Sequence, residues 1–500
     1  MTNDYPAGEQ VSASPRSNCN FILLFVALVV LGCSAVYVAG TLGVGPAIIG
    51  IAACMALLRG VVDFTFMCRL LIVALPFVPT YIWENGPSFI TGPRVIFVLL
   101  VTTFVSAFFA YVLRPARFRL PSFSAIFYLY VLVFVLGALN GARSTISTPD
   151  YFKAMSIVVS TSPIDYLISS LVIPLLIPLT CIACALLTTN AHKPDSASGP
   201  MFISALGFAA MIVWYALAQP LPFPELAGQA SRGFLSGTGL HANEIGLLMN
   251  MVFALSLFSW SESTSIRQRI VLSVLVLTSA TAATFSFSRA AFLGTFFVIV
   301  YLAWWKKSSV TLIGICAITL ALVLSPIPLL QRSAEAIRYQ DVSVLSSGRV
   351  EDIWIPMLSE LKAHPIIGNG HGSILWSEAA HKQLILPVGH PHSAYLGALL
   401  DVGIIGSAVV AGFYMHMWRT FYQVSSTVRI DVLRGFFGGA RACIILLAIQ
   451  GVTDDSFMPT FTHCYLWLSY GFAIGLQARH RRAGNNESDD RSPPTQCLEK

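Results

Sequence analysis

Long apolar runs alternate with short polar segments along most of the 500-residue chain. A run of this kind predicts a membrane-spanning helix when it approaches the ~20 residues that cross the hydrocarbon core of a bilayer. Because several of the runs are short, we expect twelve to fourteen transmembrane helices and an all-α, polytopic membrane fold. The runs cover residues 21–39, 44–58, 66–82, 95–113, 122–139, 165–188, 201–219, 240–260, 270–285, 290–305, 310–330, 393–417, 435–452 and 461–477.

The polar segments divide the chain into a simple order of parts. The first segment lacks the positive cluster and the cleavage site of a signal peptide, and the last is polar and contains Pro, which is typical of disorder. The expected parts are a cytoplasmic tail at 1–20, transmembrane helices over 21–330 with external loops at 140–164 and 220–239, a large external loop at 331–392, transmembrane helices over 393–478 and a disordered cytoplasmic tail at 479–500.

The large loop at 331–392 has a pattern of its own. From Ser347 to Leu361 its apolar residues recur at helical spacing, which predicts an amphipathic helix near the membrane surface. A glycine-rich turn follows at Ile367–Gly372. A helix followed by such a turn indicates a folded segment rather than an unstructured linker, so we look for function here.

Composition supports the membrane assignment and excludes two classes of protein. Charged residues make up 11% of the chain, against about 25% in soluble proteins. Apolar residues reach 55% and the mean hydropathy is +0.72, so a soluble protein of this size is excluded. The net charge of +6 indicates no nucleic-acid partner, because the basic residues lie singly at the ends of apolar runs rather than in a stripe.

The distribution of basic residues predicts the orientation in the membrane. With the N-terminus in the cytoplasm, 20 of the 30 Lys and Arg residues fall on the cytoplasmic side. Half of the other ten lie in the large loop, where the positive-inside rule is weak. We therefore expect both termini inside and the large loop outside.

Most of the ten cysteines lie within apolar runs. Cys181 and Cys184 have the CxxC spacing of some redox and metal sites, but their neighbours are those of a membrane helix. We interpret them as small apolar residues of that helix.

The expected external face carries Arg232, Arg289, Arg349 and His392. Guanidinium groups stay charged and match phosphate oxygens with bidentate hydrogen bonds, so together they can hold a diphosphate without a metal ion. They also stabilise the charge that grows on a diphosphate leaving group. A neutral histidine can accept the proton of an attacking hydroxyl. The alternative for Arg289 is an interfacial anchor at a helix end.

Other polar residues on this face have competing explanations. His390 and His392 belong to a group of histidines in the large loop, so a zinc site is an alternative explanation for them. Residues two apart in the sequence do not lie on the same face of a helix. The paired carboxylates Asp454 and Asp455 are explained as an acid/base device, as partners of an arginine or as a solvated loop end. Glu244 is explained as a semi-buried functional residue or as the ion-pair partner of an Arg. These residues are His364, His371, His381, His390, Glu244, Asp454 and Asp455.

Four segments in order resemble the superfamily of O-antigen ligases and Wzy-type polymerases of bacterial polysaccharide assembly. The strongest runs from His392-Ser393 through nine residues to Gly403-Ile-Ile-Gly406. Upstream, Gly348-Arg349 through Trp354 and then His364-Pro-Ile-Ile-Gly-Asn-Gly370 resemble the block of the large loop. Arg232 with Gly237 and Asn243, and Ser288-Arg289, resemble two earlier arginine blocks. Ser393 departs from the commoner Asn, and the spacing after Arg232 is loose.

The resemblance implies a metal-independent, inverting glycosyltransferase of the GT-C type, with no cofactor, in the bacterial inner membrane. Its donor is a glycan on undecaprenyl diphosphate in the periplasmic leaflet. By the same resemblance, His392 activates the acceptor hydroxyl, and Arg232 and Arg289 bind the diphosphate. Arg349 does the same or holds the loop helix in place.

The resemblance leaves the acceptor open. A ligase transfers the glycan to lipid A-core, whereas a polymerase transfers it to a second lipid-linked repeat unit. The single large loop favours a ligase, and the length of the chain suits an exopolysaccharide polymerase as well. A different class, a secondary transporter or lipid-linked glycan flippase, requires charged residues at mid-span, and most charges here lie at span ends.

Overall fold

The computed structural model describes residues 63–80, 92–113, 118–155, 162–220, 238–307, 348–453 and 456–489, and the single positions 59, 115 and 235. Every regular element within these residues is helical. The predicted spans at 21–39, 44–58 and 310–330 lie outside them, as do both ends of the chain and most of the 220–239 loop.

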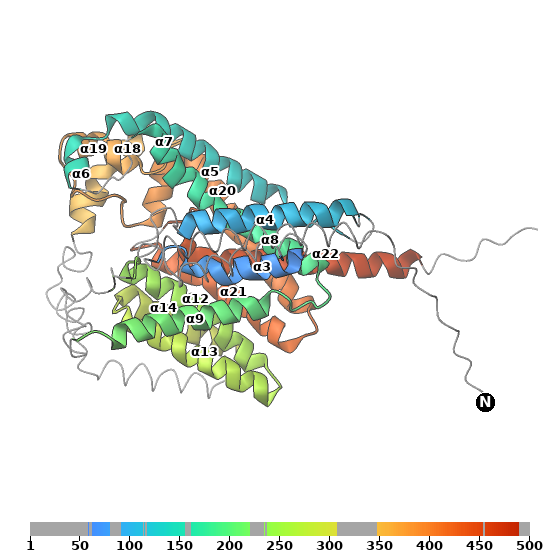
Figure 1. Ribbon diagram of the computed structural model, residues 1–500. Coiled ribbons are helices and arrows are strands. Elements are labelled where there is room, and N and C mark those ends of the chain that lie inside the picture. The colour runs from blue at the N-terminus through green and yellow to red at the C-terminus, as the bar shows by residue number, and fades with distance from the viewer. Residues whose placement is uncertain are drawn as a thin grey trace, which may run out of the picture.

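Each of the other predicted spans contains a helix (Figure 1). In the part of the chain that the structure describes, nine helices are long and apolar enough to cross a membrane, and the α3–η1 segment is shorter. The fold is therefore that of a polytopic helical membrane protein, as predicted. The helices are α3 (Phe64–Ala74) with η1 (Leu75–Phe77), α4 (Gly92–Leu113), α5 (Ala125–Ser144), α7 (Pro163–Leu167) continuing through η4 (Ile168–Val172) into α8 (Ile173–Asn190), α9 (Ser198–Leu217), α12 (Ala242–Glu262), α13 (Ile266–Phe285), α14 (Arg289–Lys306), α20 (Ala394–Thr427), α21 (Asp431–Gln450) and, after η8 (Phe461–His463), α22 (Cys464–Asp489).

Helix α12 lies at the centre of its part of the bundle. It is buried along almost its whole length and packs against α13, α14 and α21. On α21, Gly435 and Gly439 face α12 so closely that a Cβ atom would stand 2.2 Å from the carbonyl oxygen of Phe258 and 2.5 Å from that of Ala254. Small residues four apart are how membrane helices approach each other closely, so this pair fixes α21 against α12.

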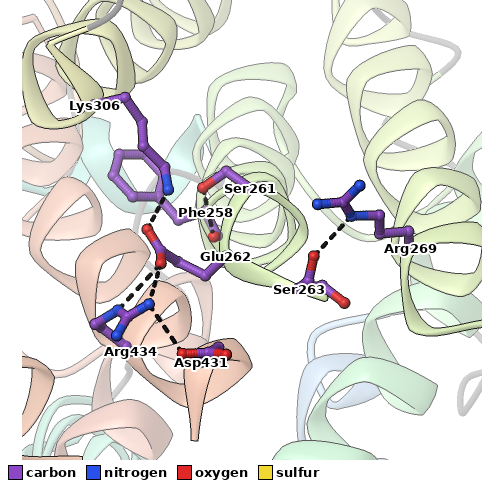
Figure 2. A network of polar contacts seen from close by, with 8 residues as sticks. All are labelled: Phe258, Ser261, Glu262, Ser263, Arg269, Lys306, Asp431 and Arg434. Atoms are coloured by element: carbon purple, nitrogen blue, oxygen red, sulfur yellow. Dashed lines mark hydrogen bonds and ion pairs between the residues drawn. The ribbon is translucent and has the colours of Figure 1, made fainter. Parts of the chain in front are cut away.

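Helix ends that the sequence predicts to lie on the same side of the membrane lie together in the structure. The end of α12, the end of α14 and the beginning of α21 meet through Glu262, Lys306 and Arg434 (Figure 2). The beginning of α12 and the end of α21 meet at the opposite end, where the Gln450 side chain donates to the Asn243 carbonyl oxygen at 2.7 Å. Residues expected on one side of the membrane therefore lie at one end of the bundle.

Residues 348–392, which we call the 348–392 loop, fold into short helices at one end of the bundle, near α6 (Asp150–Ala154; Figure 1). They are η6 (Val350–Trp354, π-helical), α18 (Ile355–Ala363), η7 (Ser373–Trp376) and α19 (Glu378–His381). Their core includes Ile353, Met357 and Phe152 of α6. The Tyr151 hydroxyl donates to the Ala380 carbonyl at 2.9 Å, and partial burial raises the pKa of this phenol.

Helix α20 is broken at Gly403, whose φ of +67° is a conformation that other residues rarely adopt. The glycine-rich turn of the 348–392 loop fills the break. The amides of Asn369 and Gly370 donate to the carbonyls of Leu400 and Asp401 at 2.8 and 2.9 Å. The amide of Ile404 donates to the carbonyl of Pro365, also at 2.9 Å. Backbone groups freed by a break in a membrane helix need such partners, so the turn and the break belong together.

The last helix differs from the sequence prediction. Helix α22 continues past residue 478, where the sequence predicts a disordered tail, and ends at Asp489. Arg479 helps to explain the difference, because its guanidinium donates to the carbonyls of Thr188, Ala191 and His192 at the end of α8.

Candidate active site

Arg289 is the first residue of α14. Ser288 precedes it as the N-cap, and its hydroxyl accepts from the Ala291 amide at 3.4 Å. Serine is favoured here because its oxygen satisfies an amide that the helix leaves without a partner. The same hydroxyl donates to the Asn243 side-chain oxygen at 2.6 Å, which joins α14 to the beginning of α12.

The beginning of α12 is fixed by a reciprocal cap. The His241 ring nitrogen accepts from the Asn243 amide at 3.4 Å, and the Glu244 carboxylate accepts from the His241 amide at 2.7 Å. This arrangement is a capping box, in which two amides at a helix N-terminus are satisfied at once. Glu244, which the sequence offers as a functional candidate or an Arg partner, therefore helps to cap the beginning of α12.

Arg349 approaches the same place from the 348–392 loop. It lies directly before the π-helical turn η6, is half-buried, and its guanidinium donates to the carbonyl of Thr453, just beyond the end of α21. Short π-helical segments are common at functional sites. The contact ties the loop to the end of α21.

Arg289 and Arg349 line one cavity of about 480 Å³, which we call the arginine cavity. Below the two guanidiniums, Leu293 and Phe297 of α14 give it an apolar wall. An amphiphile with an anionic head and a hydrocarbon tail fits this combination. The lining residues are Asn243, Ser288, Arg289, Ala290, Leu293, Phe297, Arg349, Ile449, Val452 and Thr453.

Among the described residues, Arg289 has no carboxylate partner in the arginine cavity. The described lining contains no Asp or Glu, and no ion pair between described residues involves the exposed Arg289 side chain. A cation at a helix N-terminus opposes the helix dipole and costs about 0.3–1 kcal/mol. The helix dipole therefore does not favour an arginine at this position.

His392 lies next to the arginine cavity without lining it. Two residues after it, the Ala394 amide donates to the Gly451 carbonyl at 2.8 Å, and Gly451 directly precedes the lining residue Val452. His392 has a φ of +53°, a conformation that costs a residue other than glycine about 1–3 kcal/mol and is often found at functional sites. The indole NH of Trp354 donates to the Pro391 carbonyl at 2.8 Å and holds this turn.

Residues 274–411 match the family model described as O-antigen ligase. The match confirms the resemblance to the O-antigen ligase and polymerase superfamily. It spans Arg289, Arg349, His392 and the Gly403–Gly406 pair, whereas Arg232 lies before it. A search of curated proteins found no match. The match supports an O-antigen ligase- or polymerase-type function in general, which is the transfer of a glycosyl group.

The structure describes some of the predicted site residues and not others. It brings Arg289 and Arg349 into one cavity and puts His392 beside it. Arg232 and the pair Asp454–Asp455 lie outside the described residues, so their roles stay predictions.

The histidines of the 348–392 loop have separate surroundings. The His390 ring lies 4.1 Å from that of His392, centroid to centroid. His364 lies 3.8 Å from the Glu360 carboxylate, and His381 is exposed at the end of α19. Among the residues that the structure describes, no three His, Cys, Asp or Glu side chains are grouped as metal ligands would be. Cys181 and Cys184 are buried thiols of α8, as interpreted from the sequence.

His371 lies inside the protein, against α5. It is buried, its ring stacks on Phe134, and its Nε2 atom lies 2.9 Å from the Phe134 carbonyl oxygen. Its Nδ1 atom lies 3.7 Å from the Asp401 carboxylate, beside the break in α20. The glycines on both sides of it in the turn are the only signal for this insertion in the sequence.

Proposed function

We propose that this protein transfers a glycan en bloc from undecaprenyl diphosphate to an acceptor at the periplasmic face of the bacterial inner membrane. The observation that carries the proposal is the arginine cavity. Two guanidiniums line it together with an apolar wall, and a polyprenyl diphosphate requires both. The end of the bundle that holds this cavity would face the periplasm, with both termini in the cytoplasm.

In the proposed reaction, Arg289 and Arg349 bind the diphosphate. The acceptor oxygen forms a bond to the anomeric carbon while the bond from that carbon to the phosphate oxygen breaks. The electron pair of that bond leaves with the diphosphate, whose growing charge the guanidiniums stabilise. The proton of the acceptor hydroxyl passes to His392, acting as general base. Displacement from the opposite face inverts the anomeric centre.

The proposed reaction is metal-independent, because the guanidiniums supply the positive charge that a divalent ion supplies elsewhere. Arg232, which the resemblance assigns to the same diphosphate, would add a third cation. Guanidinium suits this task since it offers a planar fork of donors and keeps its charge at all working pH values.

The acceptor we favour is lipid A-core, which makes the protein an O-antigen ligase. The matched family model carries that description, and the single large loop agrees with it. A Wzy-type polymerase of O-antigen or exopolysaccharide, with a second lipid-linked repeat unit as acceptor, is the alternative with the same chemistry.

The test uses the purified full-length protein with a glycan on undecaprenyl diphosphate and, in separate reactions, lipid A-core or a second lipid-linked repeat as acceptor. We expect release of undecaprenyl diphosphate that depends on lipid A-core and continues in excess EDTA. Release only with the lipid-linked repeat would identify a polymerase. Movement of the lipid with an intact glycosidic bond would contradict glycosyl transfer and favour a flippase.

A further inference from the structure

A second cavity, of about 430 Å³, lies between α20 and α21. On α20 its lining begins at Tyr395 and extends to Tyr414, about five helical turns further. On α21 it includes Ile444, Leu447 and Ala448. These residues belong to helices that are long and apolar enough to cross a membrane, so this groove lies at membrane depth. We call it the α20–α21 groove.

The described surface of the α20–α21 groove is almost wholly hydrocarbon. The hydroxyls of Tyr395 and Tyr414 donate to the carbonyls of Ala448 and Phe457, both at 2.9 Å, and so offer their rings rather than a free donor. The described lining contains no Lys, Arg, Asp or Glu. An apolar chain gains about 0.8 kcal/mol for each methylene that such a surface buries, whereas a charged group would have no partner.

The groove and the arginine cavity adjoin the same helix end. Ala448 lines the groove and the next residue, Ile449, lines the arginine cavity, so the last turn of α21 separates the two. Tyr395, at the head of the groove, follows His392 by three residues. The general base of the proposed reaction is therefore close in sequence to the head of the groove.

We propose that the α20–α21 groove binds an acyl chain of the lipid acceptor. The inference rests on the proposed function, in which two lipids must present their head groups to one base. The donor has its place in the arginine cavity, where the wall formed by Leu293 and Phe297 continues below the guanidiniums. The groove and the arginine cavity adjoin the last turn of α21, so two lipids bound in them would meet at the same helix end.

The described lining has no cation, so it receives the hydrocarbon part of a lipid and not an anionic head group. The acceptor that the proposed function favours, lipid A-core, carries acyl chains. A polyprenyl chain in the groove is the alternative that the experiment tests.

The experiment uses the full-length protein in nanodiscs and two photoreactive probes. One is an acceptor glycan on an acyl chain with a terminal diazirine, and the other is undecaprenyl diphosphate with a diazirine in its tail. We expect the acyl probe to label peptides of α20 and α21 and the polyprenyl probe to label α14. Labelling of α20 and α21 by the polyprenyl probe alone would overturn the proposal.

A variant that fills the groove gives the kinetic test. Ala411 lines the groove and is exposed, so Ala411→Phe fills it without crowding the protein core. We expect the KM for the acyl-linked acceptor to rise about tenfold, the loss that corresponds to about two displaced methylenes. A soluble acceptor glycan without a chain should keep its KM. The control is Ala210→Phe, which adds the same bulk at an exposed alanine of α9.

The outcomes separate this proposal from the proposed function. An unchanged KM for the acyl-linked acceptor in Ala411→Phe, together with no acyl labelling of α20 and α21, would refute the groove and leave glycosyl transfer standing. Absence of transfer with every acceptor would refute the proposed function. The acyl probe would in that case still decide what the groove binds.

Discussion

The two ends of the helix bundle differ in how their charged residues are paired. At one end, Glu262 receives hydrogen bonds from Lys306 and Arg434, the latter at 2.6 Å, and Arg434 also pairs with Asp431 at 3.0 Å (Figure 2). The Glu262 side chain is only 10% exposed, so this charge is balanced inside the protein. Three helix ends are held together as a result.

At the other end, the arginine cavity contains two guanidiniums and no carboxylate in its described lining. Arg289 also stands at a helix N-terminus, where its charge is unfavourable. The difference between the ends indicates different tasks. The charges of Glu262, Lys306 and Arg434 are paired within the protein and hold helices together, whereas the Arg289 charge has no ion-pair partner among the described residues.

The largest effect is expected from removing the base beside the arginine cavity. We predict that His392→Ala lowers the transfer rate at least about 100-fold, the usual contribution of a general base. The amount of protein in the membrane should not change. The rate is measured as acceptor-dependent release of undecaprenyl diphosphate, with His381→Ala as control because His381 is exposed on the same loop. Full activity of His392→Ala would contradict its assigned role.

The next effect concerns the arginine without an ion pair among the described residues. We expect Arg289→Ala to lower kcat about 100-fold, as the loss of one donor to a developing charge does. Arg289→Lys should recover only part of the rate, because an ammonium group lacks the bidentate fork. Both variants should unfold at the temperature of the wild type in thermal melts. A lower melting temperature with normal kcat would instead make Arg289 a structural residue.

A smaller effect is expected from the turn that holds His392. Trp354→Phe keeps an aromatic ring, although a smaller one, and removes the indole NH that donates to the Pro391 carbonyl. Since one hydrogen bond contributes about 0.5–1.5 kcal/mol, we predict a fall in kcat of about three- to tenfold with little change in KM. Steady-state kinetics with both substrates would measure this. A change in KM alone would show that Trp354 acts on binding rather than on the base.

The smallest effect on activity is expected at the paired end. Glu262→Gln removes the carboxylate that Lys306 and Arg434 share, and we predict a loss of about 1–2 kcal/mol in stability because the partners are partly exposed. The transfer rate should stay within about threefold of the wild type, well below the changes expected of a general base. Thermal unfolding and the release assay together test this. Strong loss of activity without loss of stability would remove the distinction between the ends.

The sequence predicts the helices well because apolar length is a local property. All predicted spans in the described residues contain a helix, although the one at 66–82 is short, and the predicted external residues Arg289, Arg349 and His392 lie at one end. Their convergence follows from topology, since alternate helix ends must share a face.

Other features depend on contacts between distant residues, which no local sequence pattern predicts. The break of α20 at Gly403 requires the backbone of Pro365–Gly370 as partner, and the sequence separates the two by more than thirty residues. One partner of Arg349 is a backbone carbonyl, which every residue has. The burial of His371 depends on the same insertion.

The central claim is that the arginine cavity binds a lipid diphosphate. The most direct measurement is the affinity of the purified full-length protein for undecaprenyl diphosphate, compared among the wild type, Arg289→Ala and Arg434→Ala. We predict a Kd at least about tenfold higher for Arg289→Ala, equivalent to about 1.4 kcal/mol, and an unchanged Kd for Arg434→Ala. Equal affinity in all three proteins, or a loss confined to Arg434→Ala, would contradict the claim.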